Sequence, residues 1–321
     1  MKIALLGTGF GQAHAAVYAH RPDVTDVVVF GRTPAKLEKF ADDFGFATTT
    51  DLDALITDPS VDLVDICLPT HLHADTAIRA MQAGKNVLIE LPLATTMDDA
   101  QRVIDTQHTT GRRAFVDMFS RFSPANAHLR EAAEDQRYGA LLSLETESRT
   151  ALLWPGYDLA LGSLAMDVMH ADFDLVTSLL GAPDTVHVTG TEGPGGRGSA
   201  ADVILGYPNA TARCSASSLM PKPYAMRGGY RATFTGAVLE HVTTAGPTGQ
   251  GISTLTAHSA DGEHTINLPD THTYTQVIEH VLACLDGREE SRIDPTSALG
   301  ALRLTLDVHD ELTATRAAHQ S

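Results

Sequence analysis

Apolar runs alternate with segments of helical spacing over the first 120 or so residues. The apolar runs predict strands at residues 3–6, 27–30, 63–68, 87–89 and 114–119. Between them, helical spacing with Asp, Thr or Pro near the starts predicts helices at residues 34–44, 53–56, 73–83 and 97–107. Strands that alternate with helices are typical of a parallel sheet wound by crossover helices. We therefore expect residues 1–120 to form a doubly wound α/β domain.

The pattern changes after residue 121. Helical spacing predicts helices at 125–134 and 165–180, and alternation predicts a strand at 142–147. Further strands are predicted at 186–189, 201–205, 212–217, 231–234, 238–243, 253–258 and 265–268, and two helices near 274–285 and 295–314. Turns at Gly and Pro between these strands favour antiparallel pairing. We expect residues 121–321 to form an α+β domain on an open, mostly antiparallel sheet, with the last helices able to pack back on the first domain.

The first predicted strand ends at Gly7, and two more glycines precede the first helix. A tight turn without Cβ atoms lets a pyrophosphate approach the free N–H groups at a helix N-terminus. The spacing departs from G-x-G-x-x-G, because the sixth position is Gln12. The turn nevertheless joins a strand to a helix, and a second strand follows at the distance where the ribose is read. The predicted dinucleotide-binding turn consists of Gly7, Thr8, Gly9, Phe10 and Gly11.

The residues after the second predicted strand favour NADP(H) over NAD(H). A carboxylate at this place accepts hydrogen bonds from the ribose hydroxyls and repels a 2′-phosphate. This chain has Gly31 there. Arg32, Thr33 and Lys36 then offer a guanidinium, a hydroxyl and an ammonium group, which are the groups that bind phosphate. We expect these three residues to contact the 2′-phosphate of NADP.

Composition excludes several classes of partner. Acidic residues outnumber basic ones by 40 to 23, which gives a formal net charge of −17, so nucleic acid is not an expected partner. No run of 18 apolar residues occurs, and the first apolar run is too short and glycine-rich for a signal peptide, so we expect a cytoplasmic protein with no membrane partner. Cys67, Cys214 and Cys284 form no C-x-x-C pair and are predicted to be reduced, buried thiols. The 15 histidines are scattered, and no metal site is expected.

Several segments carry a family resemblance. Residues 67–94 read CLPTHLHADTAIRAMQAGKNVLIELPLA, and the glycine turn is followed by His14. Later come residues 121–124, which read RFSP, and a helix that holds Asp167, Asp172 and Asp174. Together these segments resemble the glucose-fructose oxidoreductase, inositol dehydrogenase and MocA (Gfo/Idh/MocA) family over the whole chain. The resemblance implies an N-terminal Rossmann domain, a C-terminal α/β domain whose open sheet forms oligomers, and hydride transfer between a nicotinamide and a sugar, cyclitol or related hydroxyl compound.

Two positions depart from the family's pattern. The family carries Glu-Lys-Pro after the fifth strand, with the lysine directed at the nicotinamide and the reacting carbon, whereas this chain has Leu91 in place of the lysine. Leucine cannot donate a hydrogen bond to a developing alkoxide. The family also carries an aspartate followed four residues later by a histidine. Alignment on Asp167 places Ala171 there and His170 one residue early. Both positions share the general face of Asp167 on a helix, so His170 either still reaches the site or is satisfied within the domain interface.

The candidate site residues follow from the motifs and from the family resemblance. The predicted acid/base groups are His170, Asp167 and Asp172, since carboxylates in a partly dry cleft can have raised pKa values. The resemblance places Leu68, Pro69, His73, Glu90 and Leu91 near the cofactor, with His73 in an orienting role. It places Asp117, Arg121, Trp154 and Tyr157 near the substrate, where Trp154 and Tyr157 could stack on a ligand or belong to the core.

Three functions remain open on the sequence. The leading hypothesis is an NADP-dependent oxidoreductase that acts on a sugar, cyclitol or related small hydroxyl or keto compound. A second is a non-redox enzyme on the same scaffold, catalysing an elimination, isomerisation or cyclisation, because Leu91 and Ala171 replace the family's catalytic groups. A third is a catalytically silent NADP-binding protein. The open sheet predicts a homodimer or homotetramer formed through the C-terminal domain.

Overall fold

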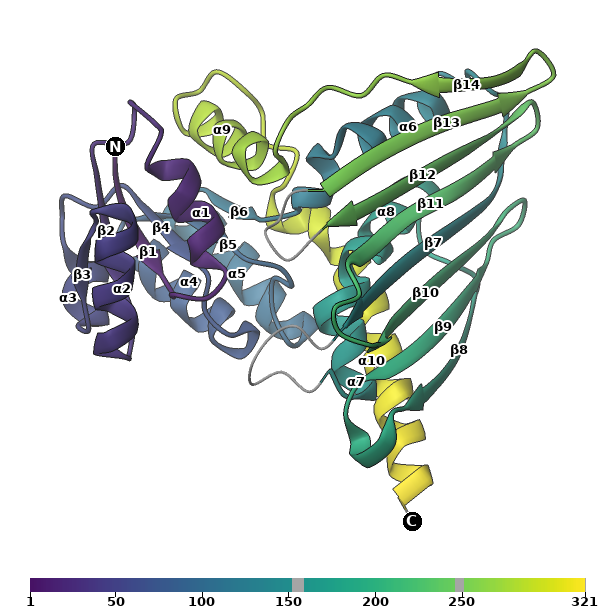
Figure 1. Cartoon of the computed structure of the whole chain (residues 1–321). Coiled ribbons are helices and arrows are strands. Elements are labelled where there is room, and N and C mark those ends of the chain that lie inside the picture. Colours follow the sequence, from purple (N-terminus) through teal and green to yellow (C-terminus); the bar gives the residue numbers. More distant parts are fainter. Residues whose placement is uncertain (152–158, 246–250, 321) are drawn as a thin grey trace. The chain divides into compact units, whose positions relative to one another are not determined.

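The computed structural model describes residues 1–151, 159–245 and 251–320 (Figure 1). It divides the chain into two compact units. Unit 1 consists of Met1–Phe122 and Thr271–Leu299, and unit 2 of Ser123–Asp270 and Gly300–Ser321. The segment Thr271–Leu299, near the end of the chain, thus belongs to the same unit as the first 122 residues.

Unit 1 is built on a six-stranded sheet in which every recorded strand pair is parallel. Its order is β3-β2-β1-β4-β5-β6. The strands are β1 (Lys2–Leu6), β2 (Asp26–Phe30), β3 (Ala47–Thr49), β4 (Leu63–Ile66), β5 (Asn86–Ile89) and β6 (Ala114–Val116). Apart from Lys2 and Asn86, the first residues of β1 and β5, the side chains of β1, β4 and β5 are fully buried on both faces, as is typical of a sheet covered by helices on each side. The sheet order reverses at β1, and this confirms the doubly wound α/β fold of the first domain.

Helices begin and end in unit 1 where local sequence signals place them. The helices are α1 (Gly11–Tyr18), α2 (Pro34–Phe44), α3 (Leu52–Thr57), α4 (His73–Gln82), α5 (Met97–Thr110) and α9 (Thr273–Leu285), with 3₁₀ turns at Thr70–Leu72, Phe119–Phe122 and Pro295–Ala298. The Asp51 side chain accepts from Ala54 N, and the Thr96 hydroxyl accepts from Asp99 N, so both residues cap their helices. Helix α5 ends at Gly111 in the left-handed conformation.

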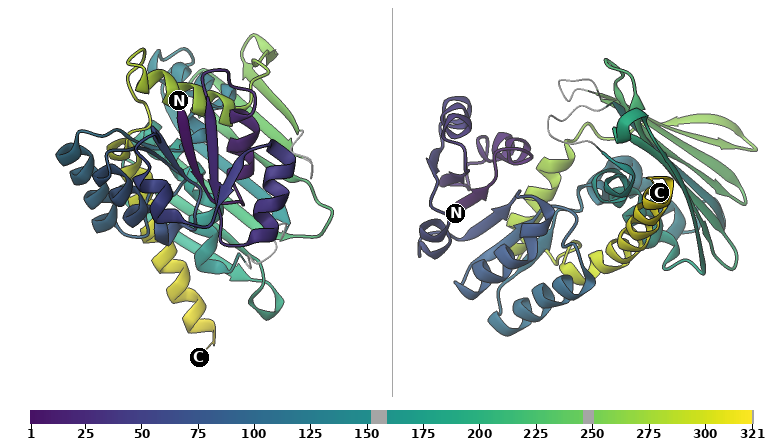
Figure 2. Two further views of the ribbon diagram at one scale, coloured as in Figure 1. Left: turned by 90° about the vertical axis from the view of Figure 1, so that its left-hand side faces the viewer. Right: turned by 90° about the horizontal axis from the view of Figure 1, so that it is seen from below.

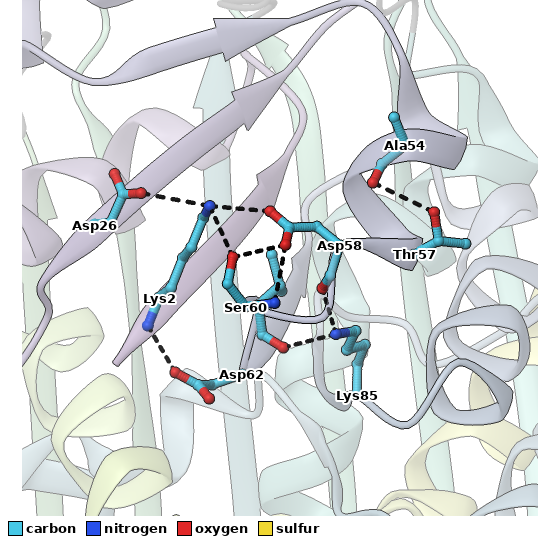
Figure 3. A network of polar contacts seen from close by, with 9 residues as sticks. Lys2, Asp26, Ala54, Thr57, Asp58, Ser60, Asp62 and Lys85 are labelled. Atoms are coloured by element: carbon cyan, nitrogen blue, oxygen red, sulfur yellow. Dashed lines mark hydrogen bonds and ion pairs between the residues drawn. The ribbon is translucent and has the colours of Figure 1, made fainter.

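A polar network joins the amino-terminal ends of the strands in unit 1 (Figure 3). Lys2 Nζ lies 3.0 Å from an oxygen of Asp58, 3.1 Å from Ser60 Oγ and 3.6 Å from an oxygen of Asp26. Lys85, which is 4 % exposed, donates to the backbone carbonyls of Val61, at 2.9 Å, and Asp58. These hydrogen bonds and ion pairs hold the amino-terminal ends of the strands together. The glycine turn lies at the carboxyl ends of the strands, on the opposite side of the sheet.

Unit 2 is built on an eight-stranded sheet in the order β14-β13-β12-β11-β7-β10-β9-β8. Its strands are β7 (Leu141–Ala151), β8 (Thr185–Glu192), β9 (Ser199–Gly206), β10 (Thr211–Met220), β11 (Met226–Phe234), β12 (Ala237–Ala245), β13 (Gly251–Ser259) and β14 (Gly262–Ile266). The pair β7–β10 is parallel and the other recorded pairs are antiparallel. The predicted fold class, a mostly antiparallel second sheet, is therefore confirmed.

Helices cover one face of this second sheet (Figure 2). They are α6 (Pro124–Glu134), α7 (Leu161–Leu164), α8 (His170–Leu180) and α10 (Leu299–Gln320), with a π turn at Ala165–Met169 between α7 and α8 and a 3₁₀ turn at Pro194–Gly196. Apolar side chains of the helices pack on those of the strands: Leu164, Phe173 and Val308 share one core with Leu144 and Val203. Residues on the opposite face of the strands, such as Glu147 and Arg213, remain solvent-accessible, and we call this side the open face.

Candidate active site

The glycine turn is shaped for close approach by a ligand. Gly7 has a φ of +119°, and a Cβ there would lie 2.3 Å from the carbonyl oxygen of Cys67, so only glycine fits. Gly9 differs, because a Cβ at this position would have no heavy atom of a described residue within 4 Å. The backbone before α1 is therefore open on the side of Gly9. These features fit the pyrophosphate of a dinucleotide at the N-terminus of α1.

The end of β2 carries the residues predicted to contact the 2′-phosphate of NADP. Gly31 is buried, and a Cβ there would lie 2.9 Å from the Leu37 side chain and 3.0 Å from that of Thr8. No carboxylate can therefore occupy this position without rearrangement. Arg32, Thr33 and Lys36 are exposed, so the guanidinium and ammonium groups remain available to a phosphate. The structure thus places the three predicted phosphate ligands together at the carboxyl end of β2.

His73 holds two loops together. Its Nδ1 lies 2.8 Å from the carbonyl oxygen of Pro92, and its Nε2 lies 2.7 Å from that of Leu68. Burial lowers the pKa of His73 against the opposing effect of the two carbonyls. These contacts connect the loop after β4, which contains Pro69, with the loop after β5, which contains Leu91. They suit the orienting role expected for His73 and leave neither ring nitrogen directed at a ligand.

Four ionisable side chains from different elements meet in the interior of unit 1. His14 on α1 is fully buried, and its Nδ1 lies 2.7 Å from Asp65 Oδ2 on β4. Its Nε2 lies 2.9 Å from Asp117 Oδ2, after β6, and 3.4 Å from Glu90 Oε1, after β5. Asp65 and Asp117 are fully buried, and Glu90 is 7 % exposed. We call these four residues the His14 cluster.

Neighbouring groups complete the surroundings of the His14 cluster. The Tyr18 hydroxyl donates to Asp65 Oδ2 at 2.7 Å, and Leu91 N donates to Glu90 Oε2 at 3.1 Å. Cys67 Sγ lies 3.5 Å from Asp65 Oδ1 and 3.6 Å from His14 Nδ1. The Tyr274 ring on α9 lies 5.4 Å from the His14 ring. The neighbours therefore donate to Asp65 and Glu90, whereas both carboxylate oxygens of Asp117 lack a well-aligned hydrogen-bond donor within the described part of the chain.

The charges of the His14 cluster oppose one another. Burial favours the neutral imidazole of His14, but Asp65, Cys67 and Asp117 outweigh it and hold the pKa of His14 well above its ordinary value. Burial, together with the nearby Glu90, raises the pKa of Asp117 to about 6, although His14 acts in the opposite direction. The interior of unit 1 thus combines an imidazolium with a carboxyl group that titrates near neutral pH.

The donor atoms of His14, Cys67 and Glu90 lie within 4.8 Å of one another. However, Cys67 lies beside Nδ1, which Asp65 already occupies, whereas Glu90 lies beside Nε2. A metal ion on one ring nitrogen would need both side chains at the same lone pair. The arrangement therefore suits protons better than a metal ion.

The predicted acid/base residues of unit 2 do not share one environment. Asp167 is exposed in the π turn, whereas His170 is 1 % exposed and its Nδ1 lies 2.7 Å from Thr305 Oγ1 on α10. Asp172 is partly buried and accepts from Ser148 Oγ at 2.9 Å. Burial raises the pKa of Asp172 to about 7. The contact with Thr305 gives His170 a structural role within unit 2, and its catalytic role stays a prediction.

Two of the four predicted substrate residues lie in the described part of the chain, and each has its own set of contacts. Arg121 donates to Ser297 Oγ and to the carbonyl oxygens of Ser297 and Arg292, so it fixes the segment after α9. Asp117 belongs to the His14 cluster. Trp154 and Tyr157 lie outside the described residues.

His14 and Asp65 were missing from the residues predicted for the site. Each carries a signal in the sequence, because Asp65 interrupts an apolar strand and His14 lies in an alanine-rich helix. Buried polar groups need hydrogen-bond partners, so a buried His14 or Asp65 would each require one. Only the folded sheet, however, places α1 against the ends of β4, β5 and β6.

Comparisons with known proteins place the first domain in a family. The model of an oxidoreductase family with an NAD-binding Rossmann fold, GFO_IDH_MocA, matches residues 1–118. Inositol 2-dehydrogenase of Rhizobium meliloti is 31 % identical over 193 residues, which cover 60 % of this chain and 58 % of that protein. D-xylose 1-dehydrogenase (NADP(+)) 2 of Haloferax volcanii is 27 % identical over 99 % of both chains.

The similarity extends to the second domain at the level of the fold. The solved structure of UDP-N-acetylglucosamine 3-dehydrogenase from Acidithiobacillus ferrooxidans superposes with a TM-score of 0.78 at 23 % identity, and covers 96 % of both chains. The first curated relatives are matched over only 39 %, 42 % and 58 % of their own length. Within the described ranges, no helix is both long and apolar enough to cross a bilayer. Residues 1–118, the first domain, thus match the Gfo/Idh/MocA oxidoreductase family that the sequence resembles.

Proposed function

We propose that the chain is an NADP-dependent oxidoreductase that transfers a hydride to or from a sugar, cyclitol or related small hydroxyl or keto compound. The observation that carries the proposal is the combination of an open backbone at Gly9 with two exposed cations, Arg32 and Lys36, after β2. The bound nicotinamide would supply hydride acceptance or donation, and the chain's residues would position it. The relatives named for inositol and D-xylose support a polyhydroxylated substrate.

The first test is a titration of the purified protein with NADPH and NADH, followed by nicotinamide fluorescence. Tight binding of NADPH and weaker binding of NADH are expected. The complex is then offered ketones and lactones, and the complex with NADP⁺ is offered myo-inositol, D-xylose and UDP-N-acetylglucosamine. Oxidation or reduction of the bound nicotinamide by one of them supports the proposal. Absence of binding by either cofactor contradicts it.

The preference for NADP is tested by Arg32→Ala. The guanidinium is expected to contact only the 2′-phosphate, so the affinity for NADPH should fall about tenfold or more while that for NADH stays within about twofold. Arg112→Ala is the matched control, because Arg112 is an exposed arginine of the same unit near the start of β6. Equal losses for both cofactors in the Arg32 variant would show that Arg32 does not read the phosphate.

A non-redox reaction is the second candidate, and Leu91 is the observation that favours it. The family's lysine would donate a hydrogen bond worth about 2.7–4 kcal/mol to a developing alkoxide, and leucine removes it. Leu91→Lys separates the two functions: a gain of hydride transfer indicates a disabled dehydrogenase, whereas loss of a native activity indicates a role for the leucine. A catalytically silent NADP-binding protein would show tight binding and no turnover in either form.

The second sheet supports the prediction of a homodimer or homotetramer. On the open face, Ile204, Val242 and Ile252 are 49 %, 42 % and 69 % exposed. The same face has a recess of about 270 Å³, which Arg149 and Arg231 help to line. Exposed apolar side chains on an open sheet favour burial against another copy. The three cysteines are buried and free of disulfides, which supports a reducing compartment such as the cytoplasm.

A further inference from the structure

The His14 cluster contains more negative charge than its surroundings neutralise. Three carboxylates, on Asp65, Glu90 and Asp117, surround one imidazole. In the described part of the chain, no lysine or arginine forms a recorded ion pair with any of them. With an imidazolium and three carboxylates, the buried site would have a net charge of −2. Burial of an uncompensated charge is strongly unfavourable, so this site must hold an additional cation.

The contacts indicate where a proton would be held. Asp65 accepts from Tyr18 and Glu90 accepts from Leu91 N, so each has a donor besides His14. Among the described residues, the contact recorded for the Asp117 carboxylate is with Nε2 of His14 at 2.9 Å, and neither of its oxygens has a well-aligned donor. A carboxylate without donors is the one that gains most from protonation. Glu90 Oε1 and Asp117 Oδ2 both lie beside the same nitrogen, at 3.4 Å and 2.9 Å, and can share the proton.

The position of the cluster relates it to the cofactor. Arg32 and Lys36 mark the end of β2 as the adenosine side of the sheet. In a doubly wound sheet of this order, the two halves of a dinucleotide extend across the point where the order reverses. The nicotinamide half therefore belongs to the ends of β4, β5 and β6. Asp65, Glu90 and Asp117 lie in or directly after these three strands.

We propose that Glu90 and Asp117 hold one exchangeable proton against the His14 imidazolium, and that this proton is released to solvent when the oxidised, cationic nicotinamide binds. The second part of this proposal, the release of the proton on binding of the cofactor, rests on the proposed function. The step balances as one carboxyl group becoming a carboxylate and one proton entering the buffer. The anionic cluster then neutralises the nicotinamide charge, as no lysine at position 91 opposes it. The other titratable groups that face the cluster are Tyr18 of α1, Cys67 directly after β4, His73 of α4 and Tyr274 of α9.

The test compares proton release on binding of NADP⁺ and NADPH. Calorimetric titrations at pH 6 in buffers of different ionisation enthalpy give the number of protons released by each cofactor. The 2′-phosphate also titrates near this pH, but both cofactors carry it, so its contribution cancels in the difference. We expect NADP⁺ to release roughly 0.3 proton more than NADPH. Its affinity should rise about fivefold between pH 5.5 and 7.5, with a smaller change for NADPH.

Asp117→Asn keeps the shape of the side chain and removes the exchangeable proton. This variant should abolish the difference in proton release, and Glu90→Gln provides the same test if the first variant does not fold. Asp105→Asn is the matched control, because Asp105 is an exposed aspartate on α5 of the same unit. Equal release by the two cofactors in the wild-type protein, or an unchanged difference in both variants, would overturn the proposal. One equivalent of bound metal in the purified protein would also overturn it.

A measurement without cofactor separates this proposal from the proposed function. Carboxyl carbons of the apo protein, labelled with ¹³C, are followed by NMR between pH 4 and 9. A resonance that titrates near neutral pH and is absent from Asp117→Asn supports the proton site, even if neither cofactor binds. If Asp117 shows no titration in this range, the proton site is rejected, whereas failure of cofactor binding alone rejects the proposed function.

Discussion

Two glycines of one turn are required for different reasons. Gly7 is constrained by the protein itself, because its φ of +119° and the carbonyl of Cys67 leave no room for a Cβ. Gly9 has no such neighbour and leaves space for a ligand. A sequence motif treats both residues alike. The structure explains the first glycine by the fold and leaves the second free for its predicted role in binding.

Gly7→Ala and Gly9→Ala should therefore behave differently. We expect Gly7→Ala to destabilise unit 1 by about 3 kcal/mol or more, because a backbone carbonyl must move away. Gly9→Ala should unfold like the wild-type protein but bind NADPH at least about tenfold more weakly. Urea unfolding and fluorescence titration measure the two effects. A stable Gly7→Ala variant, or unchanged binding by Gly9→Ala, would contradict this division.

Asp172 makes the stability of unit 2 depend on pH. Its pKa is raised to about 7 by burial, whereas an aspartate in the unfolded chain titrates near 3.9. The folded state therefore binds more protons between these values, and the free energy of unfolding falls as the pH rises from about 4 to about 7. The amide of Asp172→Asn can still accept from Ser148 Oγ but cannot ionise.

At pH 8 we expect Asp172→Asn to be more stable than the wild-type protein by about 4 kcal/mol, and at pH 4.5 the two should agree within about 1 kcal/mol. Thermal unfolding at a series of pH values measures the difference. Asp261→Asn, at an exposed aspartate of the same unit, should leave the pH profile unchanged. A constant difference between wild type and Asp172→Asn at all pH values would show that Asp172 ionises normally.

Single residues predicted only part of the candidate site. The glycine turn and Arg32 could be predicted as candidates, because each lies in a short contiguous motif. Glu90 and Asp117 were also predicted, but their meeting with His14 and Asp65 was not, because the four residues come from α1, β4 and the ends of β5 and β6. Asp65 and Asp117 are adjacent to His14 only through the sheet order.

Elements were predicted well where burial enforces a pattern. The boundaries of α2 agree with helical spacing at 34–44, since apolar Leu37 and Phe40 face the core. Strand β3 was missed because only Ala47 of its three residues, Ala47–Thr49, is apolar and the strand lies at the sheet edge. Strand β14 begins and ends earlier than the segment 265–268. The parallel pair β7–β10 leaves no local signature, because long connections decide strand direction.

The contact between α8 and α10 can be tested through Thr305. Its hydroxyl donates to the carbonyl of Ala301 at 2.7 Å and therefore accepts from Nδ1 of His170. Thr305→Val keeps the volume but removes the acceptor, and should destabilise unit 2 by about 1–3 kcal/mol. Thr305→Ser should remain within about 1 kcal/mol of the wild-type protein. Urea unfolding distinguishes them, and equal stability of the two variants would show that the bond to His170 is unimportant.

At the scale of the whole molecule, charge and sheet pattern act together. The net charge of −17 disfavours association between arbitrary surfaces, yet the open face pairs its own charges across strands. Arg231 Nε lies 2.7 Å from Glu240 Oε1, and Arg213 Nη2 lies 2.7 Å from Asp202 Oδ1. Because these charges are neutralised within the sheet, two copies can approach through this face without strong repulsion.

The open face should therefore be the self-association surface. Ile252 and Val242 are exposed on neighbouring strands, β13 and β12, and a carboxylate at either place would be buried without a partner in an oligomer. We expect light scattering to give a dimer or tetramer of the 34.2 kDa chain, and Ile252→Asp with Val242→Asp to give the monomer. Thr95→Asp adds a carboxylate to an exposed site of unit 1 and should leave the mass unchanged. An oligomer that survives the double substitution must use another surface, and the apolar side chains of the open face would then need a different occupant.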